Sequence, residues 1–470
     1  MAEASERELR RTMVAVVFGA LMSMLDTTIV NIAIRTLSLR LRTDLSSVQW
    51  VVTGYLLALA ATLPLAGWLA DRVGPRRLYV WSIAVFTVMS VACGFSSSVG
   101  ELIGFRVLQG IAGALTMPVG QIIMVRVAGR ERIARVMGTI SIPIVMAPVF
   151  GPVIGGLLVE HLGWQWIFFV NLPVGLVAIP LSLWLLPREP VSRSPLPDIP
   201  GFIMISGGSV AATYGLASAG GPAVRVWLPI GLGIVLLGAF VLRSARRTRP
   251  LLDVRLYRNP AYSASSLVNF ALGAAIFGAM ILMPLYYQSV RHLDPVLTGL
   301  LVAPTGIGAA IAMRLAARLT DRIGSGWTAV IGGSLGVLGT IPFLFLGSST
   351  PYLWISAAMV IRGIGISLCM IPAMTAIYRS VPPASTSDAT TQLSVLNRLG
   401  GSTGTAVFTV VLSRSLAAGA GAAAYGDAFR WALAAAVLAV VPAAFLLRIE
   451  SRRRATEVAT AAEPKVPTAS

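Results

Sequence analysis

An aspartate lies in the middle of an apolar run near the start of the chain. Asp26 belongs to the segment Leu25-Asp26-Thr-Thr-Ile-Val-Asn31-Ile-Ala, inside the run 12–34, which is long enough to cross a lipid bilayer. A carboxylate at that depth costs roughly 2.5–3.5 kcal/mol on insertion scales, and such acids usually have a functional role. A buried carboxyl group can also bind and release a proton near neutral pH. We therefore expect Asp26 to exchange a proton; the alternative is a structural carboxylate that caps a hydroxyl or pairs with an arginine.

Three arginines also lie inside apolar runs. Arg106 begins the segment Arg106-Val-Leu-Gln109-Gly110-Ile-Ala-Gly113. A buried arginine needs an acceptor group or water. Arg106 is therefore either a partner in proton transfer or anion binding, or a polar contact that holds helices together. Arg362 and Arg398 raise the same question, because each could line a cavity or extend toward the membrane surface.

The composition indicates a chain that lies in a membrane. Of the 470 residues, 56% are hydrophobic and 12% are charged, whereas soluble domains contain about 25% charged residues. The net charge is +18, but the arginines lie in short loops between apolar runs, so we exclude nucleic-acid binding. The first run has no cleavage site for a signal peptidase, so we expect it to be retained. The few histidines and cysteines are not spaced as metal ligands are, so we expect no metal and no cofactor. The sequence has no phosphate-binding loop, so we expect no use of ATP.

Apolar runs of roughly twenty residues predict an all-α membrane protein with about fourteen spanning helices. Six runs precede a polar, proline-rich break, two follow it, and six more follow a basic connector. The expected spans are 12–34, 47–69, 78–96, 102–125, 136–159, 165–186, 201–219, 226–243, 263–288, 297–317, 327–347, 352–378, 389–413 and 427–448.

The basic residues of the loops predict the orientation. Arginines concentrate in alternate loops, on the side that also holds both termini, and the positive-inside rule assigns this side to the cytoplasm. The outer loop with Arg35, Arg40 and Arg42 is an exception. Lys465 is the only lysine, which is typical of a GC-rich bacterial genome. We expect a monomer in a bacterial cytoplasmic (inner) membrane, because so many helices can form a complete bundle alone.

An internal repeat divides the chain. Gly67-Trp-Leu-Ala-Asp71-Arg72-Val-Gly74 recurs 250 residues later as Ala317-Arg-Leu-Thr-Asp321-Arg322-Ile-Gly324. Duplicated halves are typical of secondary transporters whose substrate site lies between the halves. We therefore expect an N-terminal six-helix half over 1–187, a two-helix insert with a basic connector over 188–260, a C-terminal six-helix half over 261–449, and a disordered cytoplasmic tail over 450–470. The insert is expected to be peripheral to the transport path.

The repeated segment also brings charges to the ends of helices. Gly74-Pro75 forces a tight turn, and the charges around it could hold one conformation of the halves and separate in the other. The alternative is that this basic loop only sets the topology. The expected latch residues are Gly67, Asp71, Arg72, Gly74, Arg76, Arg77, Asp321 and Arg322. Gly326 and Trp327 replace the last two arginines in the second copy, so we expect that copy to be the weaker latch.

A proline and glycine pattern occurs in the run 136–159. Pro148 and Pro152 remove backbone hydrogen bonds and bend a helix, and the glycines provide a face for close helix packing. We expect this helix to seal a cavity or to act as a rocking surface; the alternative is a plain packing interface. The residues concerned are Gly151, Pro152, Gly155 and Gly156.

Taken in order, these motifs resemble the major facilitator superfamily and, within it, the fourteen-helix drug:proton antiporters of the multidrug efflux permease type. The resemblance extends over about residues 12–448. It rests on the Asp26 segment, on Gly67–Arg77, on Arg106–Gly113, whose arginine is implicated in proton transfer in that group, on Gly151–Gly156 and on Trp164–Pro173. Arg35 departs from the family's usual proline, and the second half has no obvious extra membrane carboxylate, which argues against dicationic substrates.

The resemblance implies a major facilitator fold and a proton-coupled antiporter that exports lipophilic drugs, antibiotics and dyes, not an enzyme. Asp26 and Arg106 would couple the proton gradient to export. The alternatives are transport of a lipid or lipid-linked compound, with outer arginines such as Arg35 meeting anionic headgroups, and nutrient symport on the same fold. Candidate residues of a substrate cavity are Asn31, Trp50, Tyr55, Gln121, Asn171, Asn269, Tyr286, Tyr287, Asn397 and Arg398.

Overall fold

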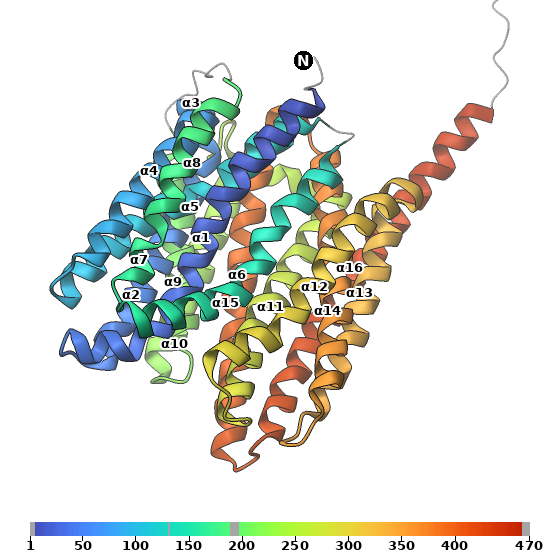
Figure 1. Cartoon of the computed structure of the whole chain (residues 1–470). Helices are drawn as coiled ribbons and strands as arrows, with labels where there is room; N and C mark the ends of the chain where they lie inside the picture. The colour runs from blue at the N-terminus through green and yellow to red at the C-terminus, as the bar shows by residue number, and fades with distance from the viewer. Residues whose placement is uncertain (1–4, 130–131, 189–196, 463–470) are drawn as a thin grey trace, which may run out of the picture.

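The chain folds into a bundle of long helices (Figure 1). The computed structural model describes residues 5–129, 132–188 and 197–462, and this described part contains α-helices and short 3-10 helices but no strand. The helices before the insert are α1 (Glu6–Arg40), α2 (Leu45–Thr62), α3 (Ala66–Val73), α4 (Pro75–Gly94), α5 (Val99–Ala128), α6 (Ile133–His161), α7 (Trp166–Phe169) and α8 (Asn171–Leu185). Those of the insert and beyond are α9 (Ile199–Ala217), α10 (Ala223–Arg246), α11 (Pro260–Ser289), α12 (Pro295–Ile323), α13 (Ser325–Thr340), α14 (Tyr352–Ser380), α15 (Thr386–Ala417) and α16 (Ala423–Ala462).

Twelve helical segments of the described residues are long and apolar enough to cross a membrane, and each overlaps an expected span. The two remaining expected spans, 136–159 and 389–413, fall within α6 and α15. α15 begins with the polar segment Thr386-Ser-Asp-Ala-Thr-Thr-Gln, and several side chains of α6 lie outside the described residues. The protein is therefore an all-helical, multi-pass membrane protein, while the count of fourteen spans stays a prediction.

Prolines divide some of the long helical segments. Leu63-Pro64-Leu65 forms a 3-10 turn between α2 and α3, and Ile341–Phe345, with a proline in its first turn, forms another after α13. Proline has no N–H group to continue an α-helical hydrogen-bond ladder. As a result α3 is a separate short helix, and it holds Gly67 and Asp71 of the repeated segment.

The helices pack as two groups. α1, α2, α4, α5, α6 and α8 contact one another and form what we call the N-terminal bundle, and α11 to α16 form the C-terminal bundle. The bundles meet where α6 packs on α12 and α14, and where α15 packs on α3 and α5. Both described ends of the chain, the start of α1 and the end of α16, lie at the same end of the molecule (top of Figure 1), which we call the termini side.

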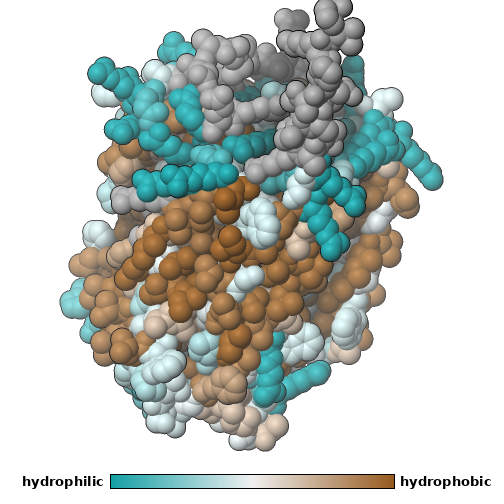
Figure 2. Space-filling model, turned by 90° about the vertical axis from the view of Figure 1, so that its right-hand side faces the viewer, coloured by the Kyte–Doolittle hydropathy of each residue, from teal (hydrophilic) through white to brown (hydrophobic). Residues whose placement is uncertain are grey.

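The surface is suited to a bilayer. Figure 2 shows a broad hydrophobic band on one face, below a hydrophilic rim at the termini side. The insert helices α9 and α10 pack on each other, and α9 also contacts α2 and α15. Large apolar side chains of α10, among them Trp227, Leu228 and Ile234, are more than half exposed. Lipid is the solvent in which such an exposed apolar helix is stable.

An ion pair joins the two helices of the insert. The Arg243 guanidinium of α10 donates to the Asp198 carboxylate at the start of α9, with an Nη2–Oδ1 distance of 2.8 Å, and Arg247 approaches the same oxygen at 3.8 Å. These hydrogen bonds from Arg243 hold the pKa of the Asp198 carboxyl below its ordinary value. The folded protein therefore gains stability from this carboxylate above the carboxyl's ordinary pKa and loses it as the pH falls through the lowered value.

We expect Asp198→Asn to lower the free energy of unfolding by about 1–3 kcal/mol, because a nearly buried, charge-assisted contact is lost. Thermal unfolding of the purified protein measured from pH 7 to pH 3 checks this, and the loss of stability on acidification should be smaller in the variant. Asp321→Asn is the control, because that carboxylate is 58% exposed and its removal should cost less than about 1 kcal/mol. Equal unfolding temperatures of Asp198→Asn and the wild type at pH 7 would contradict the prediction.

Candidate functional site

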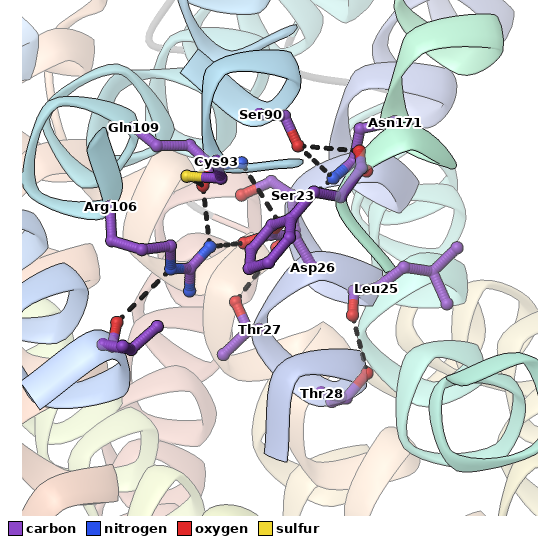
Figure 3. A network of polar contacts seen from close by, with 12 residues as sticks. Ser23, Leu25, Asp26, Thr27, Thr28, Ser90, Cys93, Arg106, Gln109 and Asn171 are labelled. Carbon is purple, nitrogen blue, oxygen red and sulfur yellow. Dashed lines mark hydrogen bonds and ion pairs between the residues drawn. The ribbon is translucent and has the colours of Figure 1, made fainter. Parts of the chain in front are cut away.

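Asp26 forms a buried ion pair at the centre of the N-terminal bundle. Its Oδ2 lies 2.6 Å from Nη1 of Arg106, which reaches it from α5, and the two side chains are 0% and 1% exposed (Figure 3). Arg106 also donates to the Val51 carbonyl at 3.3 Å. The ring of Tyr55 covers the guanidinium at 4.0 Å from its centroid. An ion pair enclosed in this way interacts strongly, because little water screens it.

Amide groups complete the surroundings of the carboxylate. Gln109 Nε2 and Asn171 Nδ2 each donate to Asp26 Oδ1 at 3.1 Å. Gln109 Oε1 accepts from Arg106 at 2.7 Å, and Asn171 also donates to the Ser90 hydroxyl at 2.9 Å. The groups that reach Asp26 from other helices are thus donors, which suits a deprotonated carboxylate. Protonation of Asp26 would cancel its charge and leave Arg106 without a counter-ion.

A small cavity lies between the two bundles, beside this ion pair. It measures about 130 Å³, and α1, α5, α11, α14 and α15 contribute to its wall. The α1 residues Ser23, Met24 and Thr27, which flank Asp26 in the sequence, line it. Ligand sites for small molecules usually measure about 300–1,000 Å³. A drug-sized molecule would therefore enter only if the bundles moved apart.

The expected cavity residues divide into three sets. Gln121, Asn269, Asn397 and Arg398 line the cavity, and Asn397 donates to Asn269 at 3.1 Å. Tyr55 and Asn171 contact Arg106 and Asp26 instead. The other aromatic residues do not line the cavity in this structure. Trp50 is 44% exposed and stacks on Tyr214 of α9, and Tyr286 and Tyr287 pack in an apolar cluster with Tyr425. The Asn31 side chain lies outside the described residues.

The two other membrane arginines occupy cavity walls. Arg398 lines the central cavity. Arg362 lines a second cavity of about 90 Å³ inside the C-terminal bundle, together with Met280, Met359 and Met370. The Arg362 guanidinium donates to the Ala275 carbonyl at 2.9 Å. Neither arginine therefore extends to the membrane surface.

The segment after α2 joins the two bundles at the termini side. Asp71 Oδ1 lies 2.6 Å from Nη2 of Arg126 in α5 and accepts a hydrogen bond of 2.8 Å from Ser387 of α15. Arg126 also donates to Ser387 at 2.8 Å. Gly67 is so close to α15 that a Cβ atom on it would lie 2.8 Å from the Ser387 carbonyl oxygen. Asp71, Arg126, Ser387 and Gly67 therefore form a contact that exists only while the bundles are together at this side.

The other expected latch residues lie apart from this contact. Arg72 lies over the Trp68 ring, Arg76 donates to the Leu183 carbonyl of α8, and Arg77 is exposed. Asp71 therefore pairs with Arg126, not with the arginines of its own loop. Gly74, at φ 93°, makes the turn between α3 and α4.

The second copy of the segment contains a weaker pair. Asp321 lies 3.5 Å from Arg379, and the two side chains are 58% and 37% exposed. Both residues belong to the C-terminal bundle, so this pair does not join the bundles. Arg322 is exposed.

The glycines of α6 pack against α1, the helix that contains Asp26. A Cβ atom on Gly151 would lie 2.0 Å from Thr28 Oγ1, and one on Gly155 would lie 3.3 Å from Ile29. Gly156 is partly exposed, and the Pro152 side chain lies outside the described residues. The close approach of α6 to α1 thus depends on Gly151 most directly.

We expect Gly151→Val to force α6 away from α1 and to cost about 1–3 kcal/mol of folding free energy, as overpacking does. Thermal unfolding of the purified variant measures this. Gly104→Val is the matched control, because a Cβ on Gly104 would meet nothing within 4 Å. If both variants unfold at the same temperature, α6 and α1 are not packed as described.

Four residues of these contacts were missed in the sequence. Gln109 and Ser90 belong to the Asp26 surroundings, and Arg126 and Ser387 belong to the contact at Asp71. Gln109 follows Arg106 by three residues and so shares its helix face, which was an available signal. Ser387 gave no signal, because nothing in the sequence shows which residue of the second half faces Asp71.

The site has no features of metal or redox chemistry. Within the described residues no group of three or more His, Cys, Asp or Glu side chains could hold a metal ion. Cys93 and Cys369 are both free and buried. The described arrangement is a buried carboxylate that one arginine and two amides hold by hydrogen bonds.

The chain is similar to bacterial resistance and export proteins and to solved transporter structures. A "Multidrug resistance protein B homolog" of Mycobacterium tuberculosis is 37% identical over 412 residues, which cover 86% of this chain and 76% of that protein. The "Tetracenomycin C resistance and export protein" of Streptomyces glaucescens is 32% identical over 413 residues, again 86% of this chain and 76% of that protein. Among solved structures, the proton:xylose symporter XylE has the same fold, with a TM-score of 0.63 at 13% identity over 94% of this chain and 95% of that chain.

A family model described as Major Facilitator Superfamily matches residues 16–405, most of the chain. The two bundles, the central cavity and the relatives are those of a transporter and not of an enzyme. The chain belongs to the major facilitator superfamily.

Proposed function

We propose that this transporter exports lipophilic small molecules, such as drugs, antibiotics and dyes, in exchange for protons across a bacterial cytoplasmic membrane. The names of the two bacterial relatives, a multidrug resistance protein homologue and an export protein, support export. The buried pair of Asp26 and Arg106 supports the use of protons. Asp26 lies on α1 between residues of the cavity wall, so a change of its charge can act on the cavity directly.

The proposed architecture is six spans, a two-span insert and six spans, with α6 and α15 as the two spans beyond the twelve apolar ones. The basic loops at the termini side support a cytoplasmic location of that side by the positive-inside rule. The insert helices contribute no described residue to the central cavity, which supports a peripheral role for them. The complete bundle supports a monomer surrounded by lipid.

In the proposed cycle the proton acts through Arg106. Protonation of Asp26 from outside removes the negative charge that holds the guanidinium at 2.6 Å. Arg106 then needs another acceptor, and its neighbours Gln109, Tyr55 and the Val51 carbonyl must rearrange around it. Since these groups lie on α2 and α5, the rearrangement moves helices that bound the cavity and favours release of the substrate. Loss of the proton to the cytoplasm restores the pair.

The contact at Asp71 sets which side of the cavity is closed. It joins α3 and α5 to α15 on the side that we place in the cytoplasm. Opening the cavity to the cytoplasm must break these hydrogen bonds, and closing it must restore them. Movement of two bundles around a central site is the usual basis of alternating access in such transporters.

Purified protein in proteoliposomes tests the proposal. An inward-directed proton gradient should drive concentrative movement of lipophilic dyes and antibiotics against their own gradient, and a protonophore should abolish it. A resistance profile of cells with and without the protein would identify substrates for this assay. If no compound of such a panel moves uphill under a proton gradient, the proposal is wrong.

A further inference from the structure

Arg398 gives the central cavity a positive charge that no described residue neutralises. It is the only charged residue among the described residues that line this cavity. Within the described part of the chain it makes no hydrogen bond and no ion pair, whereas its neighbour Asn397 binds Asn269. A cation in such a place is costly unless a partner or water compensates it.

The nearest buried carboxylate is not available to Arg398. Asp26 already pairs with Arg106 at 2.6 Å and accepts from Gln109 and Asn171. Its side chain is 0% exposed and does not line the cavity. Asp26, Arg106 and Arg398 together hold one more positive than negative charge when Asp26 is deprotonated. Protonation of Asp26 increases this excess of positive charge. The charge of Arg398 is therefore left for a ligand.

Arg362 is an arginine of the same bundle that has a structural role, and its contacts differ from those of Arg398. Its guanidinium is buried and donates to the Ala275 carbonyl, and it lines the second cavity instead of the central one. Met370 lines both cavities and separates them. Arg362 is thus held by the protein itself, while Arg398 faces open space.

We infer that the exported molecules include lipophilic monoanions, whose acidic group binds the Arg398 guanidinium in the central cavity. This inference rests on the proposed export function and adds a substrate class to it. A carboxylate or a similar planar anion matches the guanidinium fork. Asn269, Asn397 and Gln121 are amides of the same wall that can bind further polar atoms. The rest of the wall, with Met24, Met117, Met370, Met374 and Phe277, is apolar and adaptable.

The inferred substrate class determines the charge that export moves. Exit of one anion and entry of one proton each make the inside more positive. An inside-negative membrane potential therefore drives both steps. A monocation exchanged for one proton moves no net charge. Export of the anion therefore moves two charges per proton, whereas export of an uncharged molecule moves one.

The test uses one fluorescent lipophilic carboxylic acid, its uncharged amide, and a trimethylammonium analogue of the same body. Uphill transport of each is measured in proteoliposomes with wild type, Arg398→Gln and Arg398→Lys. The wild type should move the carboxylate with a KM at least about tenfold below that of the amide, as a charge-assisted contact in a low-dielectric site provides. Arg398→Gln should lose this advantage, and thermal unfolding of the purified variant shows that it is folded. Arg398→Lys should recover most of the advantage.

The outcomes separate this inference from the export proposal. Two results would overturn the inference and leave proton-driven export intact. The wild type could transport the amide uphill with no preference for the carboxylate. Alternatively, Arg398→Gln and Arg398→Lys could each lose carboxylate and amide transport to the same extent. No uphill transport of any of the three compounds would overturn both. A potassium diffusion potential, inside negative in the orientation of a cell, should speed carboxylate export in the wild type, and no response to it would also overturn the inference.

Discussion

Asp26→Asn is expected to abolish proton-driven export. Asparagine has nearly the shape of aspartate but cannot bind and release a proton, so the pair with Arg106 can no longer be broken and restored in a cycle. Uphill movement of a transported dye in proteoliposomes should fall to the level without a proton gradient. Downhill exchange of dye across the same membrane should persist, because the central cavity does not include Asp26.

Stability requires its own control, because Asp26→Asn leaves Arg106 buried without a counter-ion. Removing one partner of a buried pair typically costs about 3–5 kcal/mol. The double variant Asp26→Asn with Arg106→Gln removes both charges and should unfold at a higher temperature than the single variant, yet still fail to couple. Asp294→Asn is a matched control, because that exposed aspartate caps α12 and asparagine can cap it equally well. Wild-type uphill rates in Asp26→Asn would show that another group binds the proton.

The second large effect is expected from Gly67→Val. A Cβ atom at this position would lie 2.8 Å from both the Ser387 carbonyl oxygen and Thr391 Oγ1. Valine would therefore keep α3 from approaching α15 and prevent the contact between Asp71, Arg126 and Ser387. Overpacking of about 1–3 kcal/mol corresponds to a shift of about 5-fold to 150-fold toward the open termini side.

Spectroscopic distances between labels on α3 and α15 would measure this shift. They should lengthen in Gly67→Val, and export should fall at least about fivefold, by the same conversion of energy to population. Gly231→Val is the control, since that glycine lies on the exposed helix α10 and a Cβ there would meet nothing within 4 Å. Unchanged distances and export in Gly67→Val would mean that the bundles do not need to approach at Gly67.

Much of the fold could be predicted because lipid imposes strict rules on a sequence. Apolar runs of bilayer length predicted the helices, and twelve of them meet that criterion in the structure. Asp26 could be singled out because no other acid lies in the middle of such a run. α15 is not one of these twelve segments, because its polar start contacts α3 and the connector before α11.

The partners of these residues could not be predicted in the same way. The sequence identifies Asp71 as a latch residue but not its partner, because contacts between the bundles decide that this partner is Arg126. Trp50, Tyr286 and Tyr287 were selected by residue type, and type alone does not show which face of a helix meets the cavity. The sequence does not determine whether Arg398 faces the cavity or the membrane surface, because only the packing of α15 decides the direction of this side chain.

The most direct test of the central claim is whether a substrate gradient alone moves protons. Proteoliposomes with a pH-sensitive dye inside start at equal pH, and a transported compound is then placed on one side only. We predict that its downhill movement drives protons the opposite way with the wild type, and not with Asp26→Asn. Substrate movement without any pH change in the wild type would contradict proton exchange at Asp26.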